Sequence, residues 1–220
     1  MSLRESGCHA LNRTLKRDTD DTVGWGAIGA RTVESQVHRQ LSSGLSMPIG
    51  MKNRPDGSIG TAVDAIKAAA VPHVFTGIDH DGAPAILHTR GNPDCHLVLR
   101  GSDAGPNYDA DSVAGAQELL HKAGLPERVV IDASHGNSRK DHRRQPGVAA
   151  EIGAQVANGN QAIVGVMLES FLVEGRQELD PTRELTYGQS ITDACMGWDT
   201  TEAVLTQLRD AALTRRSGKA

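Results

Sequence analysis

The sequence predicts an α/β fold in which parallel strands alternate with helices, and within that class it favours a (β/α) barrel over an open sheet. Short apolar runs rich in β-branched residues are separated by amphipathic segments, as expected for βαβ units. Five of these runs end in a charged residue or a histidine. All strand carboxyl ends face the active site of a barrel, whereas an open sheet binds ligands near a switch point. No GxGxxG or P-loop sequence follows any run, which argues further against a nucleotide-binding sheet.

Length and composition predict one cytoplasmic domain. The 220 residues are enough to bury a sizeable core. With 23 Lys and Arg against 27 Asp and Glu, the net charge is −4, so we expect no nucleic-acid and no membrane partner. Three widely spaced cysteines without a CxxC pair are typical of a reducing compartment. The sequence shows neither an apolar run of membrane-spanning length nor the apolar core of a signal peptide.

In the first half of the chain, a polar N-terminal tail at residues 1–23 is expected to precede a domain over residues 24–220. A helix from Thr32 would place Val37, Leu41 and Leu45 on one face. The other expected elements are strands at 24–30 and 48–51, a turn at 53–57, a helix at 58–70, and a β-hairpin whose strands are 73–76 and 85–89. No helix is apparent between the hairpin strands, so the hairpin is an insertion in the alternating pattern.

The second half continues the alternation. The helix at 109–122 ends at Gly124, a common residue directly after a helix. The last helix is expected to start at Asp199, with Glu202 completing a capping box. The other expected elements are strands at 95–99, 129–135 and 162–168, a helix at 146–157, and a polar loop at 173–199.

Three of the strand ends carry cations, namely Arg31, Lys52 and Arg100. Three positive charges on one rim repel one another, so an anion such as phosphate or carboxylate is the expected occupant. A single arginine at a strand end is more commonly a surface salt-bridge residue, so only the joint occurrence favours an anion site. A second basic group, usually a solvated face but also able to attract anions, comprises Arg139, Lys140, Arg143 and Arg144.

The remaining strand ends carry metal-ligand types. His135 and Glu169 follow adjacent strands, and Asp193 in the loop after the last strand offers a third ligand. A His/Glu/Asp set suits a divalent metal such as Mn²⁺, Fe²⁺, Co²⁺ or Zn²⁺. Taken singly, the histidine is equally a loop residue and the aspartate a turn or cap residue. Cys95 and Cys195 are expected to be small buried side chains and not nucleophiles.

Six longer stretches carry a family resemblance. They are GARTVESQVHR (29–39), GMKNRPDG (50–57), GNPDCHLVLRG (91–101), IDASHGNS (131–138), GVMLESFLVEGRQ (165–177) and SITDACMGW (190–198). Together they resemble the 3-deoxy-D-arabino-heptulosonate 7-phosphate (DAHP) synthases of the type I, microbial class, collinearly from about Trp25 to the C-terminus. The resemblance implies a metal-dependent (β/α)₈ TIM barrel.

It also implies an activity and roles for the strand-end residues. DAHP synthases condense phosphoenolpyruvate with erythrose 4-phosphate at the entry to the shikimate pathway of aromatic amino acid biosynthesis. By motif position, Arg31, Lys52 and Arg100 would bind phosphoenolpyruvate. His135, Glu169 and Asp193 would ligate the divalent metal, and Lys52 and His135 would be catalytic. In the implied mechanism the cations hold the substrate anion and the metal polarises the aldehyde.

By the same resemblance, the chain enters the family's barrel at the fourth strand, so we expect about the last five β/α units plus the hairpin. The family's cysteine ligand on the first strand and its Arg/Lys loop after the second would then be missing. Five strands do not close an eight-stranded barrel, so we expect a homo-oligomer or completion by another chain. The alternative is a truncated, weakly active or inactive paralogue that acts as a modulatory subunit or is a gene remnant.

Overall fold

The computed structural model describes residues 24–78 and 81–218, and the expected N-terminal tail lies outside these ranges. Among the described residues the chain forms two compact units. Unit 1 comprises residues 24–78, 81–98 and 118–127, and unit 2 comprises residues 99–117 and 128–218. Each unit contains parallel strands and helices, so the predicted α/β class is confirmed. No helix in the described part of the chain is long and apolar enough to span a membrane.

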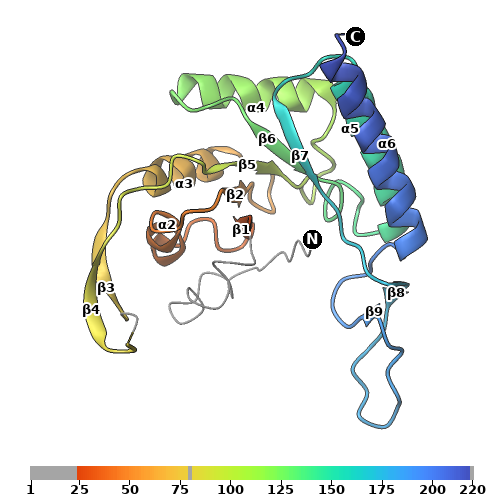
Figure 1. Ribbon diagram of the computed structural model, residues 1–220, viewed down its shortest axis with the longest axis horizontal. Helices are drawn as coiled ribbons and strands as arrows, with labels where there is room; N and C mark the ends of the chain where they lie inside the picture. The colour runs from red at the N-terminus through yellow and green to blue at the C-terminus, as the bar shows by residue number, and fades with distance from the viewer. Residues whose placement is uncertain (1–23, 79–80, 219–220) are drawn as a thin grey trace. The chain divides into compact units, whose positions relative to one another are not determined.

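Unit 1 contains three parallel strands: β1 (Gly26–Ile28), β2 (Ile49–Lys52) and β5 (His96–Leu99) (Figure 1). The last residue of β5 is the first residue of unit 2. The central strand is β2, in which Gly50 pairs with Ala27 on one side and with His96 on the other. Every residue of β1 and β2 is buried, as expected for strands covered on both faces. A Cβ atom at Gly50 would lie 2.6 Å from the ring of Trp25, so the strand needs glycine there.

Two helices of unit 1 follow β1 and β2. They are α2 (Gln36–Ser42) and α3 (Gly60–Ala70). The helix predicted from Thr32 starts four residues later, because residues 29–35 form turns in which the Thr32 and Ser35 N–H groups bond to carbonyls three residues earlier. The predicted apolar stripe is therefore partly wrong, and Val37 is 47% exposed. By contrast, α3 buries one face, made of Ala62, Val63, Ala65, Ile66 and Ala69.

The predicted hairpin is confirmed in unit 1. Its strands are β3 (Val74–Ile78) and β4 (Pro84–His88), which pair antiparallel (Figure 1). The base of the hairpin is tied by Thr89, whose N–H donates to the carbonyl of His73 at 2.9 Å. The hairpin is therefore an insertion between α3 and β5, outside the parallel strands.

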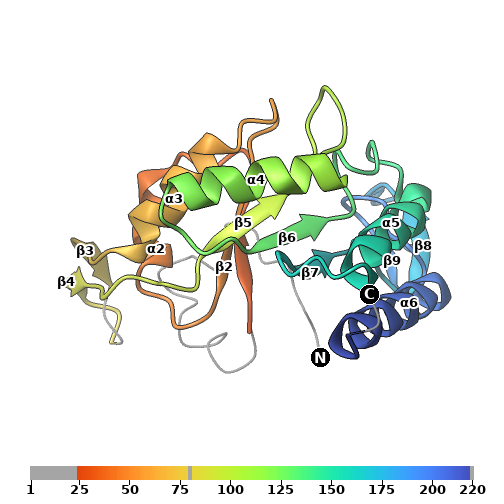
Figure 2. The ribbon, with the colours of Figure 1, turned by 90° about the horizontal axis from the view of Figure 1, so that it is seen from above.

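In unit 2, β6 (Val129–Asp132) and β7 (Ile163–Met167) pair in parallel (Figure 2). The 3₁₀ turn η1 (His142–Arg144) leads into α5 (Gln145–Ala157), and α6 (Trp198–Arg216) packs against α5. Leu168 and Leu208 pack onto a small core of Ala149, Met196 and Val204. The first residues of α4 (Ala110–Lys122) belong to unit 2, and its last residues belong to unit 1.

Two predictions for unit 2 are wrong. The expected polar loop at 173–199 contains two short parallel strands, β8 (Val173–Arg176) and β9 (Gln189–Ser190). The last helix begins at Trp198 and not at Asp199, with Gly197 as its N-cap and no side-chain capping bond. The predicted capping box is therefore absent, because Asp199 and Glu202 lie two positions too far inside the helix.

Candidate active site

The turn after β6 brings His135 back over the end of its own strand. His135 has a φ of 49°, a left-handed conformation that costs a residue with a side chain about 1–2 kcal/mol. Backbone hydrogen bonds stabilise the turn. The Lys140 N–H donates to the His135 carbonyl at 2.7 Å, and the Ser138 N–H donates to the Ser134 carbonyl at 3.2 Å. The imidazole therefore does not continue the strand direction, as the predicted strand 129–135 implied, but faces the last strand residue, Asp132.

Asp132 was missed in the sequence, although it stands three residues before the histidine. Its carboxylate is fully buried. One oxygen accepts the Ser134 N–H at 2.8 Å, and the other lies 2.8 Å from Nδ1 of His135. A carboxylate at that distance favours the imidazole tautomer with its proton on Nδ1, which leaves the Nε2 lone pair for a ligand. The spacing Asp-x-x-His identifies the two residues in the sequence, but the left-handed turn is what brings them together.

The three predicted metal ligands lie together. The imidazole Nε2 of His135 is 3.4 Å from Oε1 of Glu169, which follows β7. One ligand atom from each of His135, Glu169 and Asp193 lies within 4.8 Å of the others. Donors bonded to one divalent ion at about 2.0–2.2 Å lie at most about 4.4 Å apart, so small side-chain movements would bring three groups at this spacing onto one ion. One imidazole nitrogen and two carboxylates therefore fit a divalent metal.

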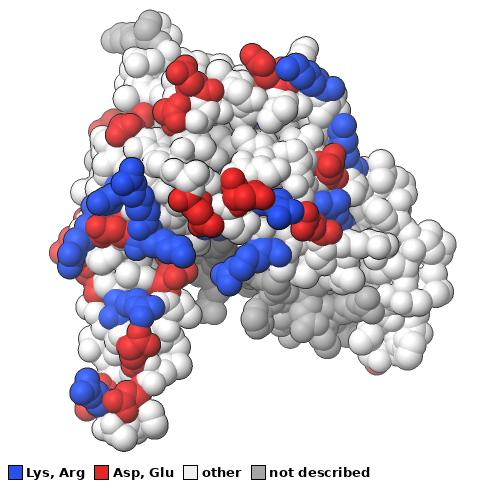
Figure 3. Space-filling view, turned by 180° about the vertical axis from the view of Figure 1, so that it is seen from behind, with Lys and Arg blue, Asp and Glu red and all other residues white. Residues whose placement is uncertain are grey.

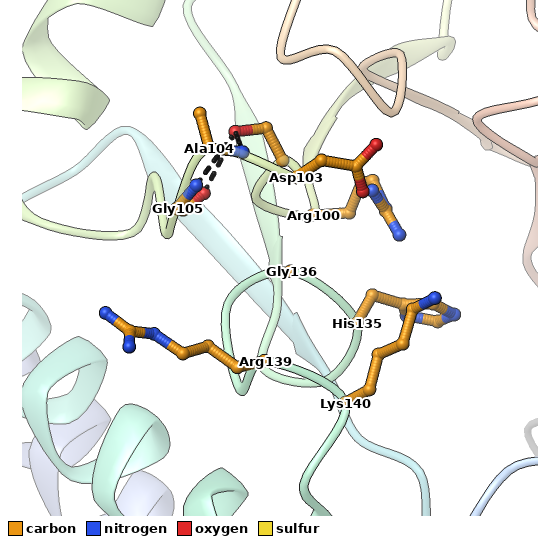
Figure 4. A pocket seen from close by; sticks show the side chains of 9 residues that line it. Arg100, Asp103, Ala104, Gly105, His135, Gly136, Arg139 and Lys140 are labelled. Carbon is orange, nitrogen blue, oxygen red and sulfur yellow. Dashed lines mark hydrogen bonds between the residues drawn. The ribbon is translucent and has the colours of Figure 1, made fainter.

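Arg100 follows β5 directly and is 8% exposed. It shares a cavity of about 390 Å³ with His135 (Figure 4). The lining comprises Arg100, Ser102, Asp103, Ala104, Gly105, His135, Gly136, Arg139 and Lys140. Lys140 lies beside the imidazole in this view, whereas Arg139 extends to the other side of the turn. Basic groups outnumber the one carboxylate of the lining, so the cavity suits an anion.

Asn137 connects the loop of Arg100 with the turn of His135. Its side-chain N–H groups donate to the carbonyls of Asp132 at 2.8 Å and Leu99 at 3.2 Å. Its side-chain oxygen accepts the Asn107 N–H at 2.8 Å, and the Asn107 side chain in turn accepts the Gly101 N–H at 2.6 Å. Sequence reasoning missed both asparagines, since only the fold shows which carbonyls they reach.

The other two predicted cations belong to unit 1. Arg31 lies exposed in the turn after β1. Lys52 is the last residue of β2 and is only 3% exposed. The three predicted metal ligands and Arg100 all belong to unit 2.

The basic group after β6 is partly neutralised. His142 Nε2 lies 2.9 Å from Glu174 Oε1, and Arg143 lies 3.6 Å from the same oxygen. Arg144 lies 3.6 Å from Asp141. In Figure 3 basic and acidic side chains are interspersed over the side that carries the segment with β8 and β9. These pairs favour the solvated-face interpretation for Arg143 and Arg144.

The two described cysteines are not activated thiols. Burial raises the pKa of Cys95 to about 12, with a further contribution from the nearby charge of Asp94. Burial also raises the pKa of Cys195, and the Glu169 charge adds to this shift. Thiols with raised pKa values hold little thiolate at neutral pH. Cys95 is buried as predicted, whereas Cys195 is only half-buried.

Known proteins resemble this chain over most of its length. A model of the DAHP synthetase I family matches residues 7–206, so the resemblance reaches further toward the N-terminus than the motifs from Trp25 onward indicated. The Phe-sensitive phospho-2-dehydro-3-deoxyheptonate aldolase of Escherichia coli K12 is 51% identical over 98% of this chain and 63% of its own length. A putative phospho-2-dehydro-3-deoxyheptonate aldolase of Schizosaccharomyces pombe is 55% identical over 90% of this chain and 54% of its own length.

A solved structure agrees with these sequences. The phospho-2-dehydro-3-deoxyheptonate aldolase from Francisella tularensis SCHU S4 superposes with a TM-score of 0.88 at 45% identity, covering 93% of this chain and 59% of that one. The chain thus spans between about half and two thirds of the length of these relatives. The family match, the identities and the superposition agree, and the chain belongs to the DAHP synthetase I family.

Proposed function

We propose that this chain carries metal-binding and anion-binding groups of a DAHP synthase, which condenses phosphoenolpyruvate with erythrose 4-phosphate to DAHP and phosphate. The observation that carries the proposal is the convergence of His135, Glu169 and Asp193, whose ligand atoms lie within 4.8 Å of one another. Family membership supports the same reaction, the first step of aromatic amino acid biosynthesis.

His135, Glu169 and Asp193 are proposed to hold a divalent ion, Mn²⁺, Fe²⁺, Co²⁺ or Zn²⁺. When bound, such an ion supplies Lewis-acid polarisation of the aldehyde carbonyl of erythrose 4-phosphate. The contact between Asp132 and Nδ1 would leave the Nε2 lone pair of His135 available to such an ion. The imidazole and two carboxylates together give a donor set that suits all four metals.

Arg100 is proposed to bind the phosphate or carboxylate of phosphoenolpyruvate, supported by its place in the basic cavity beside His135. Arg31 and Lys52, which belong to unit 1, are proposed for the same substrate on motif position alone. Lys52 and His135 are the proposed catalytic residues. In the reaction, C3 of phosphoenolpyruvate bonds to the aldehyde carbon, water adds its oxygen at C2, and the bond from C2 to the phosphate oxygen breaks.

The family also supports proposals about the wider architecture. We infer that the parallel strands belong to a (β/α)₈ barrel, of which the described residues provide about the last five units. A homo-oligomer or a complex with another chain is proposed, and a cytoplasmic location is proposed for the assembly.

The test is phosphate release by the purified full chain with both substrates and Mn²⁺. Activity above a metal-free blank is expected, and Glu169→Gln is expected to abolish it, because the ion loses a ligand. The matched control is Glu174→Gln, which neutralises an exposed carboxylate of the same unit and leaves the three ligands unchanged. No release above the blank would overturn the proposal. An inactive chain that alters the rate of a longer relative would support the modulatory alternative.

A further inference from the structure

The backbone of Glu169 is held by one buried side chain from the start of α5. Gln145 is the first residue of that helix and is fully buried. Its Oε1 accepts the Glu169 N–H at 2.8 Å, and its Nε2 donates to the Glu169 carbonyl at 3.0 Å. The amide thus pairs with both backbone groups of the same residue, as a neighbouring strand would. We propose that Gln145 is a positioning residue that sets the place of Glu169 in the proposed metal site.

The same backbone is also tied to the segment that carries Asp193. The Glu169 carbonyl accepts a second hydrogen bond, from the Met196 N–H at 3.0 Å, and the Phe171 N–H donates to the Met196 carbonyl at 2.9 Å. Met196 stands three residues after Asp193. The position of Glu169 therefore governs its own carboxylate and, through Met196, the segment of a second ligand.

Helix α5, which carries Gln145, is itself held in place by packing. Ala149 lies one turn after Gln145 on α5 and packs in the small core with Met196 and Val204. The face of α5 that carries the amide is therefore the face that packs against the ligand-bearing segment. A side chain fixed at both its backbone and its tip places its partner precisely, because little rotamer freedom remains.

Alternative roles for Gln145 account less well for the geometry. A glutamine that only filled space would need no matched pair of bonds, and an apolar side chain of its length would pack equally well in an enclosed core. A glutamine that capped a helix would bond to N–H groups of its own helix. The reciprocal pairing with a proposed metal ligand, 24 residues away in sequence, favours positioning.

The inference rests on the proposed metal site and is tested by metal affinity rather than turnover. The unmodified chain is titrated with Mn²⁺ and the free ion is followed by electron paramagnetic resonance. Gln145→Met keeps the length of the side chain but removes both hydrogen bonds, and Gln145→Ala also removes the volume. Both are expected to weaken Mn²⁺ binding about 10–100-fold, the usual effect of losing a partner that orients a metal ligand. The visible spectrum of bound Co²⁺ is expected to change with the ligand geometry.

The matched control is Gln155→Met, ten residues further along α5, where the side chain donates only to the Tyr108 carbonyl at 2.8 Å. This variant is expected to bind Mn²⁺ like the unmodified chain. Circular dichroism verifies that each variant is folded. If neither position-145 variant folds, Gln145→Asn is measured instead, since its shorter amide cannot reach both groups, and the same loss of affinity is expected.

Unchanged Mn²⁺ affinity in Gln145→Met would overturn the inference, even if Gln145→Ala binds weakly, because packing alone would then explain the residue. Absence of Mn²⁺ binding by the unmodified chain would overturn the metal site and this inference with it. Mn²⁺ binding that depends on Gln145 in a chain without phosphate release would support the positioning role while the proposed activity fails.

Discussion

Replacing Asp132 with asparagine is expected to move the imidazole proton of His135 from Nδ1 to Nε2. One oxygen of the buried carboxylate accepts the Ser134 N–H at 2.8 Å, and the other lies 2.8 Å from Nδ1 of His135. An asparagine of the same shape has one acceptor oxygen and one NH₂ group, which is a donor. In one of the two contacts the NH₂ group would therefore face another donor. The backbone N–H cannot change, whereas the imidazole can carry its proton on the other nitrogen.

The magnitude follows from the burial of the pair. A buried donor that faces another donor costs about 1–3 kcal/mol, which a change of tautomer avoids. The tautomer change puts a proton on Nε2, which lies 3.4 Å from the Glu169 carboxylate and can then no longer ligate a metal. Loss of the partner that orients a ligating histidine lowers metal affinity about 10–100-fold. At about 1.4 kcal/mol per tenfold change, this corresponds to about 1.4–2.8 kcal/mol of binding free energy.

The assay is a proton–nitrogen correlation NMR spectrum of the imidazoles, in which the two tautomers have different nitrogen shifts. The signal of His135 is assigned by its absence in His135→Ala, and Mn²⁺ affinity is measured on the same samples. Asp64→Asn, which removes an exposed carboxylate on α3 in unit 1, is the control for the change in net charge. An unchanged Nδ1–H tautomer together with unchanged Mn²⁺ affinity in Asp132→Asn would refute the reasoning.

Three further predictions concern the scaffold of the site. Gly101→Ala is expected to destabilise the chain by about 2 kcal/mol or more in urea unfolding, since φ is +75° and the new Cβ would lie 2.5 Å from the Asn137 nitrogen; an unchanged unfolding midpoint would contradict this close contact. Asp109→Ala is expected to cost about 1 kcal/mol at neutral pH, or about 2–4 °C in Tm, because Asp109 accepts the Ser112 N–H at the start of α4. Hydrogen bonds from Ser112 lower the pKa of Asp109 below 3.8, so its carboxylate stabilises the chain only above that pKa. The stability difference between the unmodified chain and Asp109→Ala should therefore vanish as the pH falls through the lowered pKa. A stability difference that persists in acid would show that the charged carboxylate is not its cause. Cys95, whose pKa burial raises to about 12, should resist iodoacetamide at about pH 8 in the folded chain and react in urea, as peptide mass mapping would show; equal labelling in both states would contradict its burial.

Sequence patterns predicted the elements where one physical signal dominates. Val129, Val130 and Ile131 are β-branched and all of β6 is buried, so the strand was predictable from composition, although it ends at Asp132 and not at residue 135. The helix α4 was predicted within one residue, because an aspartate precedes it and Gly124 with φ +68° follows it. The short strand β9 was missed because Gln189 and Ser190 form no apolar run, and their pairing is decided by a partner strand elsewhere in the chain.

The candidate site was likewise predictable from the sequence only in part. The sequence alone predicted the types and the order of the proposed metal ligands, since His135, Glu169 and Asp193 are identifiable by side-chain chemistry and by the strands that precede them. Tertiary structure alone decided what holds them. A left-handed turn returns His135 to the buried Asp132, and a helix start brings Gln145 to Glu169. The ability to bind a metal belongs to a single side chain and is recognisable in the sequence. The contacts that hold that side chain in place depend on backbone direction and on segments distant in sequence, and no local sequence pattern encodes them.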